Sequence, residues 1–181
     1  MPKLERLEWI APPGEGRGVT LTDDPAADLF LAENANALLL GVLYDSQYST
    51  RRAFAIPLRL KERLGHFEIE RLAAEDNPEL VAAFSSKPAL HRFPYRYATL
   101  TSRLAAVIVE QYGGDAAGIW RDAADVEELG RRLMALPAFG VEKTNWTVGM
   151  LGRLDMIDFP GWETYRAPAP RTRKPASQAQ A

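Results

Sequence analysis

The chain has 181 residues, of which 46% are hydrophobic and 25% charged, as is typical of a soluble globular protein with one domain. It has no cysteine, which excludes disulfides and thiolate metal sites, and its two histidines, His66 and His91, lie too far apart to predict a metal centre. The formal net charge is −2, so any binding to nucleic acid would depend on one basic face and would be modest and salt-sensitive. Because no apolar run approaches the roughly 18 residues of a membrane span, and the N-terminus lacks a signal-peptide core, we expect a cytoplasmic monomer with no membrane partner.

The first half of the chain predicts an extended arm followed by short helices. Asp24-Pro25 supplies an N-cap with Pro at the first helical position, and Asn34 or Asn36 can cap the next helix. A strong helical pattern ends at Gly65 and contains Pro57, which predicts that the helix bends or splits in two at the proline. The helices predicted in this half span residues 26–32, 37–44, 50–64, 68–74 and 78–84.

The sequence of the second half of the chain also predicts helices. Gly113 ends the longest one, Asp115 caps a brief turn, and Asp125 starts the next helix. No alternating run of β-branched residues occurs, so the predicted fold class is all-α. The helices predicted here span residues 95–112, 126–134 and 141–151, and the predicted divisions are an arm (1–22), a helical domain (23–165) and a disordered basic tail (166–181).

The segment Leu136–Thr144 predicts two helices joined by a tight turn. Pro137 stops the first helix, and Gly140 allows a sharp reversal before the second. The second helix then begins with unpaired N–H groups, which can bind a phosphate oxygen. An ordinary hairpin between two core helices explains the same pattern equally well.

Two further segments accompany this hairpin in a fixed order. One is Leu39–Ser49, a Leu-Leu segment that leads to Gln47, and the other is His91–Pro94, which leads through a helix to Gly113–Asp115. With the hairpin, they resemble the helix-hairpin-helix DNA glycosylases of base-excision repair, the superfamily of endonuclease III and the 3-methyladenine glycosylases, over roughly residues 26–158. The resemblance implies a helical bundle, here with a reduced second lobe. It also implies duplex DNA as the partner.

The resemblance further implies which residues contact DNA, whereas the absence of cysteine leads us to expect no cofactor. Many relatives of endonuclease III carry a four-cysteine iron–sulfur cluster, which this chain cannot hold. Gln47 would fill the space left by an extruded base, although an exposed loop residue is the simpler interpretation. The DNA-binding residues implied are Gln47, Tyr48, Pro137, Phe139, Gly140, Glu142, Lys143 and Thr144.

Asp158 is the implied catalytic carboxylate. In the family an Asp about 20 residues after the second glycine of the hairpin follows a β-branched residue and stabilises the cation-like sugar of the transition state. Here Asp158 follows Ile157 and lies 18 residues after Gly140. Asp155 is a rival, and Asp158 could instead cap a final helical turn around residues 160–163.

Lyase activity is not expected. Bifunctional relatives carry a nucleophilic Lys two residues after the second glycine, where this chain has Glu142. Lys143 lies one residue later, about 100° further round the helix, and is predicted to contact phosphate or to be a solvated charge. The sequence therefore predicts a monofunctional glycosylase that acts on a damaged or mismatched base. Because few residues follow the hairpin, a non-catalytic DNA-binding module and a helical protein-interaction adaptor remain alternatives.

Overall fold

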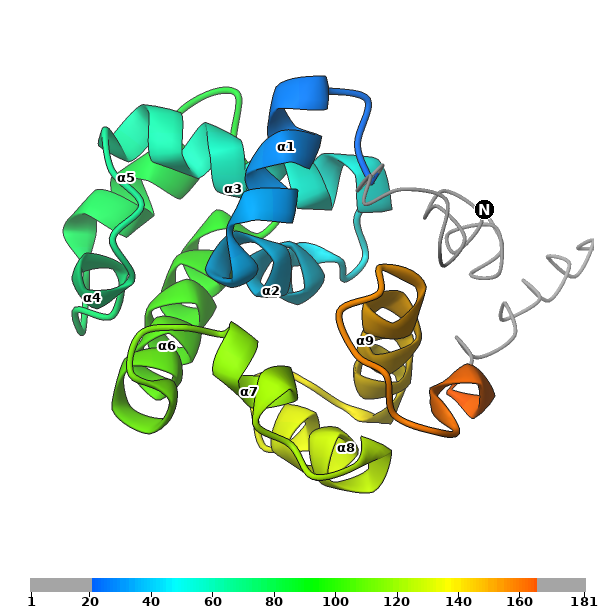
Figure 1. The fold of residues 1–181 in the computed structure, drawn as a ribbon. Helices are drawn as coiled ribbons and strands as arrows, with labels where there is room; N and C mark the ends of the chain where they lie inside the picture. Colours follow the sequence, from blue (N-terminus) through cyan, green and yellow to red (C-terminus); the bar gives the residue numbers. More distant parts are fainter. Residues whose placement is uncertain (1–20, 166–181) are drawn as a thin grey trace, which may run out of the picture.

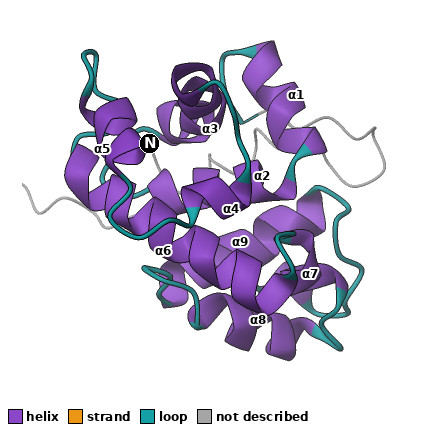
Figure 2. Cartoon of the chain, turned by 90° about the vertical axis from the view of Figure 1, so that its left-hand side faces the viewer, coloured by secondary structure: helices purple, strands orange, loops and turns teal. Residues whose placement is uncertain are grey.

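The structure is a computed structural model that describes residues 21–165, so the predictions for the basic tail and for residues 1–20 of the arm lie outside the described residues. The described part is helical and contains no strand, which confirms the all-α class (Figure 2). The helices are α1 (Pro25–Glu33), α2 (Ala35–Tyr44), α3 (Thr50–Leu64), α4 (Ile69–Leu72), α5 (Pro78–Ser85), α6 (Pro94–Tyr112), α7 (Ala117–Arg121), α8 (Val126–Met134), α9 (Val141–Arg153) and the 3-10 helix η1 (Trp162–Thr164).

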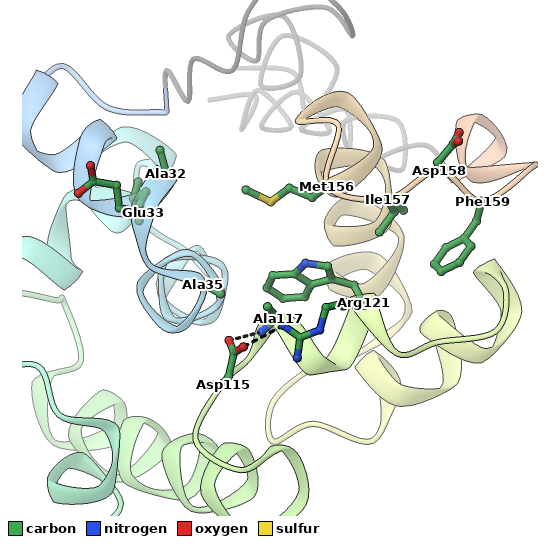
Figure 3. Close-up of a pocket in the computed structure, with 12 residues that line it drawn as sticks. Ala32, Glu33, Ala35, Asp115, Ala117, Arg121, Met156, Ile157, Asp158 and Phe159 are labelled. Carbon is green, nitrogen blue, oxygen red and sulfur yellow. Dashed lines mark hydrogen bonds and ion pairs between the residues drawn. The ribbon is translucent and has the colours of Figure 1, made fainter.

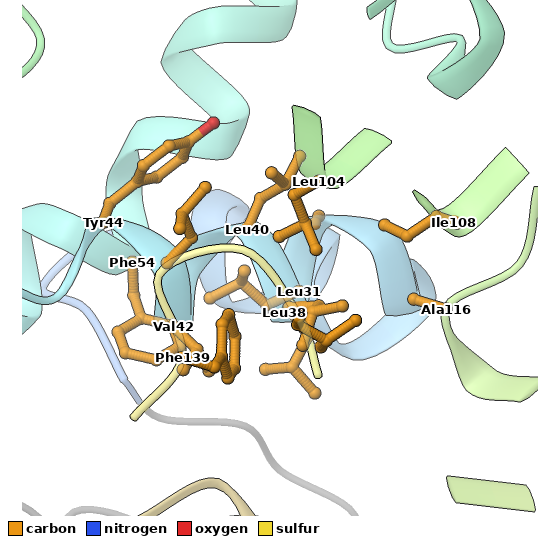
Figure 4. Packing of buried hydrophobic residues seen from close by; sticks show 14 of the residues in the cluster. Leu31, Leu38, Leu40, Val42, Tyr44, Phe54, Leu104, Ile108, Ala116 and Phe139 are labelled. Carbon is orange, nitrogen blue, oxygen red and sulfur yellow. The ribbon is translucent and has the colours of Figure 1, made fainter. Parts of the chain in front are cut away.

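The helices form two groups that share one hydrophobic core (Figure 1). In the first group, α2 packs against α1, α3 and α6, and every residue from Ala37 to Tyr44 is buried. A helix that is apolar on all sides in this way belongs at the centre of its fold. In the second group, α8 packs against α7 and α9, and α9 packs against η1. Figure 4 shows Phe139, from the turn before α9, among core side chains of α2 and α3.

Two asparagines at the start of α2 have different tasks. Asn34 is the N-cap, since its Oδ1 accepts a hydrogen bond from the Ala37 N–H at 2.9 Å. Asn36 instead links α2 to the loop before α7: its Nδ2 donates to the Gly114 carbonyl at 2.9 Å, and its Oδ1 accepts from the Ala116 N–H at 2.8 Å. Of the two caps that the sequence allowed, Asn34 is the one used.

Replacement of these two asparagines by alanine should therefore have unequal effects. Asn36→Ala leaves a backbone N–H and a carbonyl without partners beside the buried Ala116, and each such loss costs about 1–3 kcal/mol. Asn34→Ala removes one N-cap, at about 1 kcal/mol. Urea unfolding should show the larger decrease in the free energy of unfolding for Asn36→Ala, and equal decreases would contradict the bridging role.

Several predicted boundaries need correction. Pro57 lies inside one continuous helix, so α3 is not split. Helix α9 runs through Gly152 to Arg153 instead of ending at that glycine. Gly152 has a packing role, because the Trp162 ring occupies the space that a side chain would take. Leu21 and Thr22, predicted as part of the arm, are buried.

Of the helices between residues 21 and 165, none is by itself both long and apolar enough to cross a membrane. Only α1 and α2 taken together, across a bend of 118°, reach that length and composition.

Candidate functional site

The turn between α8 and α9 is tight, but its conformation differs from the prediction. The residue with a left-handed backbone is Ala138, at φ 61°, whereas Gly140 is extended, at φ −111° and ψ −178°. The expectation that Gly140 makes the reversal is therefore wrong. Gly140 is instead the N-cap of α9, where no side chain caps the helix and no atom lies within 4 Å of the position a Cβ would occupy. The first turn of α9 thus starts at an open surface.

The side chains of this hairpin divide into exposed and buried ones. Glu142 is exposed and Pro137 half-buried, whereas Phe139 and Thr144 are only 6% and 3% exposed. The prediction that Phe139 and Thr144 contact DNA must be corrected for their side chains, because burial leaves only their backbone atoms for such a contact. The buried Thr144 hydroxyl has no hydrogen-bond partner.

Lys143 is neither a solvated charge nor an open phosphate contact. Its Nζ donates a hydrogen bond to the Leu43 carbonyl at 2.9 Å and lies 5.4 Å from the centroid of the Phe139 ring. A cation at the last carbonyls of a helix is favoured by the helix dipole, and α2 has no basic residue in its own last turn. No sequence signal pointed to this contact, since α1, α5 and α6 also lack a basic residue in the last turn. Through this bond, the start of α9 lies next to the end of α2 and the loop that follows it.

Gln47 and Tyr48 occupy this loop, 45–49. Gln47 is exposed, with a left-handed backbone at φ 53°, and Tyr48 is half-buried with its ring 4.7 Å from that of His91. Tyr44, the last residue of α2 before this loop, is fully buried, and its hydroxyl forms a 2.9 Å hydrogen bond with Thr101. Because it is fully buried, the Tyr44 side chain belongs to the core and cannot stack on a base, and burial also raises the pKa of its hydroxyl.

His91 also belongs to this region, although the sequence placed it only in the His91–Pro94 segment and indicated no role for its side chain. It is 1% exposed, its Nε2 lies 3.1 Å from the Tyr44 carbonyl, and its Nδ1 accepts a hydrogen bond from the Phe93 N–H at 3.1 Å. This pattern fits a neutral ring with the proton on Nε2. Burial lowers the pKa of His91; the hydrogen bond to Tyr44 raises it, and the nearby Lys143 charge lowers it further. His91 and Lys143 thus both hold the end of α2.

The depressed pKa of His91 predicts that stability falls in mild acid. An unfolded histidine titrates near about pH 6.5, so the unfolded chain binds a proton that the folded chain resists. The stabilisation is complete above that pH and is lost as the pH falls through the lower, folded pKa. Urea unfolding at stepwise lower pH should show this loss in the wild type and less of it in His91→Gln. His66→Gln is the matched control, and equal pH dependence in wild type and His91→Gln would contradict the prediction.

Asp158 lies elsewhere, in the segment after α9. It lines a cavity of about 610 Å³ together with Trp120, Met156 and Phe159, and Figure 3 shows its carboxylate directed away from the cavity. The rival carboxylate, Asp155, does not line this cavity. The prediction that Asp158 caps a final helical turn is wrong, because the N-cap of η1 is Gly161.

The structure therefore brings together only some of the predicted site residues. Lys143 and the loop of Gln47 share one region, whereas no hairpin residue and no residue of that loop lines the Asp158 cavity. Opposite Asp158, the cavity carries an ion pair between Arg121 and Asp115, with 3.1 Å between Nη1 and Oδ2.

Within residues 21–165, no group of three or more His, Asp or Glu side chains is arranged to hold a metal ion. Comparison of the chain with protein-family models, with curated proteins and with solved structures finds no match. The described structure establishes that the protein belongs to the all-α class. The resemblance of its motifs to those of helix-hairpin-helix glycosylases stays a prediction.

Proposed function

We propose that the chain is a monofunctional DNA glycosylase-like protein of the helix-hairpin-helix kind, with a reduced second lobe. It would bind duplex DNA that carries a damaged or mismatched base and hydrolyse the N-glycosidic bond of that base. The observation that carries the proposal is the start of α9 at Gly140, which no side chain caps and which the hydrogen bond from Lys143 to Leu43 holds at the end of α2, just before the loop of Gln47.

Binding would use backbone atoms more than side-chain charge. The N–H groups at the start of α9, where no side chain caps the helix, suit a phosphate oxygen, and the open space at Gly140 lets the DNA backbone approach closely. Gln47, exposed at the tip of its loop, is the side chain that would enter the space left by an extruded base. An acidic chain can bind DNA in this way through few phosphate contacts, with a shallow salt dependence.

The cavity beside Asp158 suits the chemical step. The half-buried Phe159 offers aromatic surface to a planar base, and Asp158, with its carboxylate turned toward the cavity, would stabilise the positive charge that develops on the sugar as the bond to the base breaks. The base departs with the bonding electrons, water adds to the anomeric carbon, and the proton that the water loses neutralises the departed base. No lysine stands two residues after Gly140, and the Lys143 amine is already bonded to Leu43, so a Schiff-base intermediate is not part of the proposal.

A specific observation favours a second candidate, a DNA-binding module without catalysis. The Asp158 carboxylate points away from its cavity, and that cavity contains no residue of the hairpin or of the Gln47 loop. A module of this kind would keep DNA binding through Gly140 and lack base excision. A protein-interaction adaptor, the third candidate, would bind no DNA.

The experiment that separates these candidates is a screen of duplexes with alkylated, deaminated, oxidised or mismatched bases, scored for strand cleavage after alkali. Cleavage of one duplex class, without a covalent adduct after borohydride, supports the monofunctional glycosylase. Binding without cleavage supports the module, and no binding at low salt supports the adaptor. An adduct trapped in the wild type and lost in Lys143→Ala would overturn the monofunctional assignment.

A further inference from the structure

One stretch of this acidic chain carries positive charge only. Between residues 80 and 109 there is no Asp or Glu, while the whole chain has a formal net charge of −2. Charge is therefore segregated along the chain, and the helix α6 holds most of this basic stretch. Its cations are Lys87, Arg92, Arg96 and Arg103.

The start of α6 combines exposed arginines with exposed aromatic rings. Tyr95 is 67% and Phe93 39% exposed, so both rings offer surface to a ligand. The Arg92 guanidinium lies 5.4 Å from the centroid of the Phe93 ring, and no described carboxylate pairs with Arg92 or Arg96. The first turn of α6 also contains no acidic residue. We call Arg92, Phe93, Tyr95 and Arg96 the Arg–Tyr surface.

Ring contacts connect this surface to the loop of Gln47. The Phe93 ring lies 6.2 Å from that of His91, which lies 4.7 Å from that of Tyr48, the neighbour of Gln47. The Arg–Tyr surface therefore lies beside the loop that would meet an extruded base.

We infer that the Arg–Tyr surface binds an unpaired stretch of a DNA strand. The two arginines pair with successive phosphates, and Tyr95 stacks on a base. Charge favours this occupant, because a surface with two unpaired guanidinium groups and no carboxylate attracts a polyanion. The exposed rings favour bases, since every base offers a face on which an aromatic side chain can stack. The inference rests on the proposed function for its DNA partner and adds a preference for DNA that is locally unpaired.

The test measures the affinity of full-length protein for three probes: a paired duplex, the same duplex with a short unpaired bulge, and a single-stranded oligonucleotide of the same sequence. The variants are Tyr95→Ala and Arg92→Gln/Arg96→Gln. The controls are Leu29→Ala, an exposed apolar residue of α1, and Arg59→Gln, an exposed arginine of α3. The exposure of the substituted residues leaves the core unchanged, and circular dichroism checks the fold of each variant.

We expect the wild type to prefer the bulged and single-stranded probes. Tyr95→Ala should weaken binding to both by about ten-fold, the size of one lost base–aromatic stack. The double arginine variant should reduce the salt slope on the single strand by about 1.4, that is, about 0.7 for each lost phosphate contact. Both controls should bind as the wild type does.

Equal wild-type affinity for paired and unpaired probes, or wild-type binding by both variants, would overturn the inference and leave the proposed function standing. If polyglutamate competes with the labelled probe as well as the unlabelled oligonucleotide does, the surface recognises only negative charge, and the stacking of Tyr95 on a base is refuted. Conversely, loss of single-strand binding in these variants, with no excision by the wild type in the duplex screen, would support the inference and exclude the proposed glycosylase activity.

Discussion

Asp158→Asn is expected to lower the single-turnover rate of base excision by at least about 100-fold, a typical cost of removing one transition-state stabiliser. The amide keeps the shape of the carboxylate but loses the charge that opposes the developing sugar cation. That charge matters chiefly in the transition state, so the affinity for substrate DNA should stay equal or improve. Quench-flow excision and equilibrium binding on the same duplex measure the two quantities.

Asp155→Asn is the matched control for this experiment. Asp155 lies three residues earlier, is also exposed, and does not line the cavity that Asp158 lines. We expect Asp155→Asn to excise at close to the wild-type rate. The reverse result, with loss in Asp155→Asn alone, would move the catalytic role to Asp155. Loss of DNA affinity in Asp158→Asn would show a binding role instead of a chemical one.

Gly140→Val is expected to weaken duplex binding by about ten-fold, the effect of losing roughly 1.4 kcal/mol of contact with phosphate. The extended backbone of Gly140 accepts any residue, and the new side chain would meet no protein atom near its Cβ. The fold should therefore persist, while the valine methyls prevent the DNA backbone from approaching the first N–H groups of α9. Fluorescence anisotropy with a labelled duplex gives the affinity, and thermal unfolding checks the fold.

Two further variants complete this series. Gly140→Ala adds one methyl group and should give a smaller loss than Gly140→Val. Ala26→Val adds bulk at an exposed position of α1 and should bind as the wild type does. If Gly140→Val folds and its affinity for duplex DNA is undiminished, the hairpin serves only to pack the helices and does not bind DNA.

The helices were predictable where a local signal marks their ends. Gly65 and Gly113 have left-handed backbones, at φ 74° and 62°, and end α3 and α6 as their positions in the sequence predict. Asp125 caps α8 by accepting a hydrogen bond from the Glu128 N–H. Such signals act within one turn of the chain, so they can be read without knowledge of the fold.

The arrangement of the site could not be predicted in this way, since it depends on pairs of residues far apart in sequence. Lys143 bonds to a carbonyl 100 residues earlier, and His91 to one 47 residues earlier. A helical pattern gives the face on which Lys143 lies but not the carbonyl that it meets. The burial of Thr144 likewise follows from the docking of α9, which no local pattern encodes.

The hydrogen bond between Lys143 and Leu43 also bears on the order in which the chain folds. It closes a loop of 100 residues, whereas α5 with α6 and α8 with α9 meet through neighbours in sequence. Closing a long loop has a high entropic cost, so contacts of this span are expected to form after the local ones. Contacts that form late are also lost early in unfolding. The contact between the start of α9 and the end of α2, where we propose that DNA binds, is therefore expected to be the last part of the described fold to assemble and the first to open.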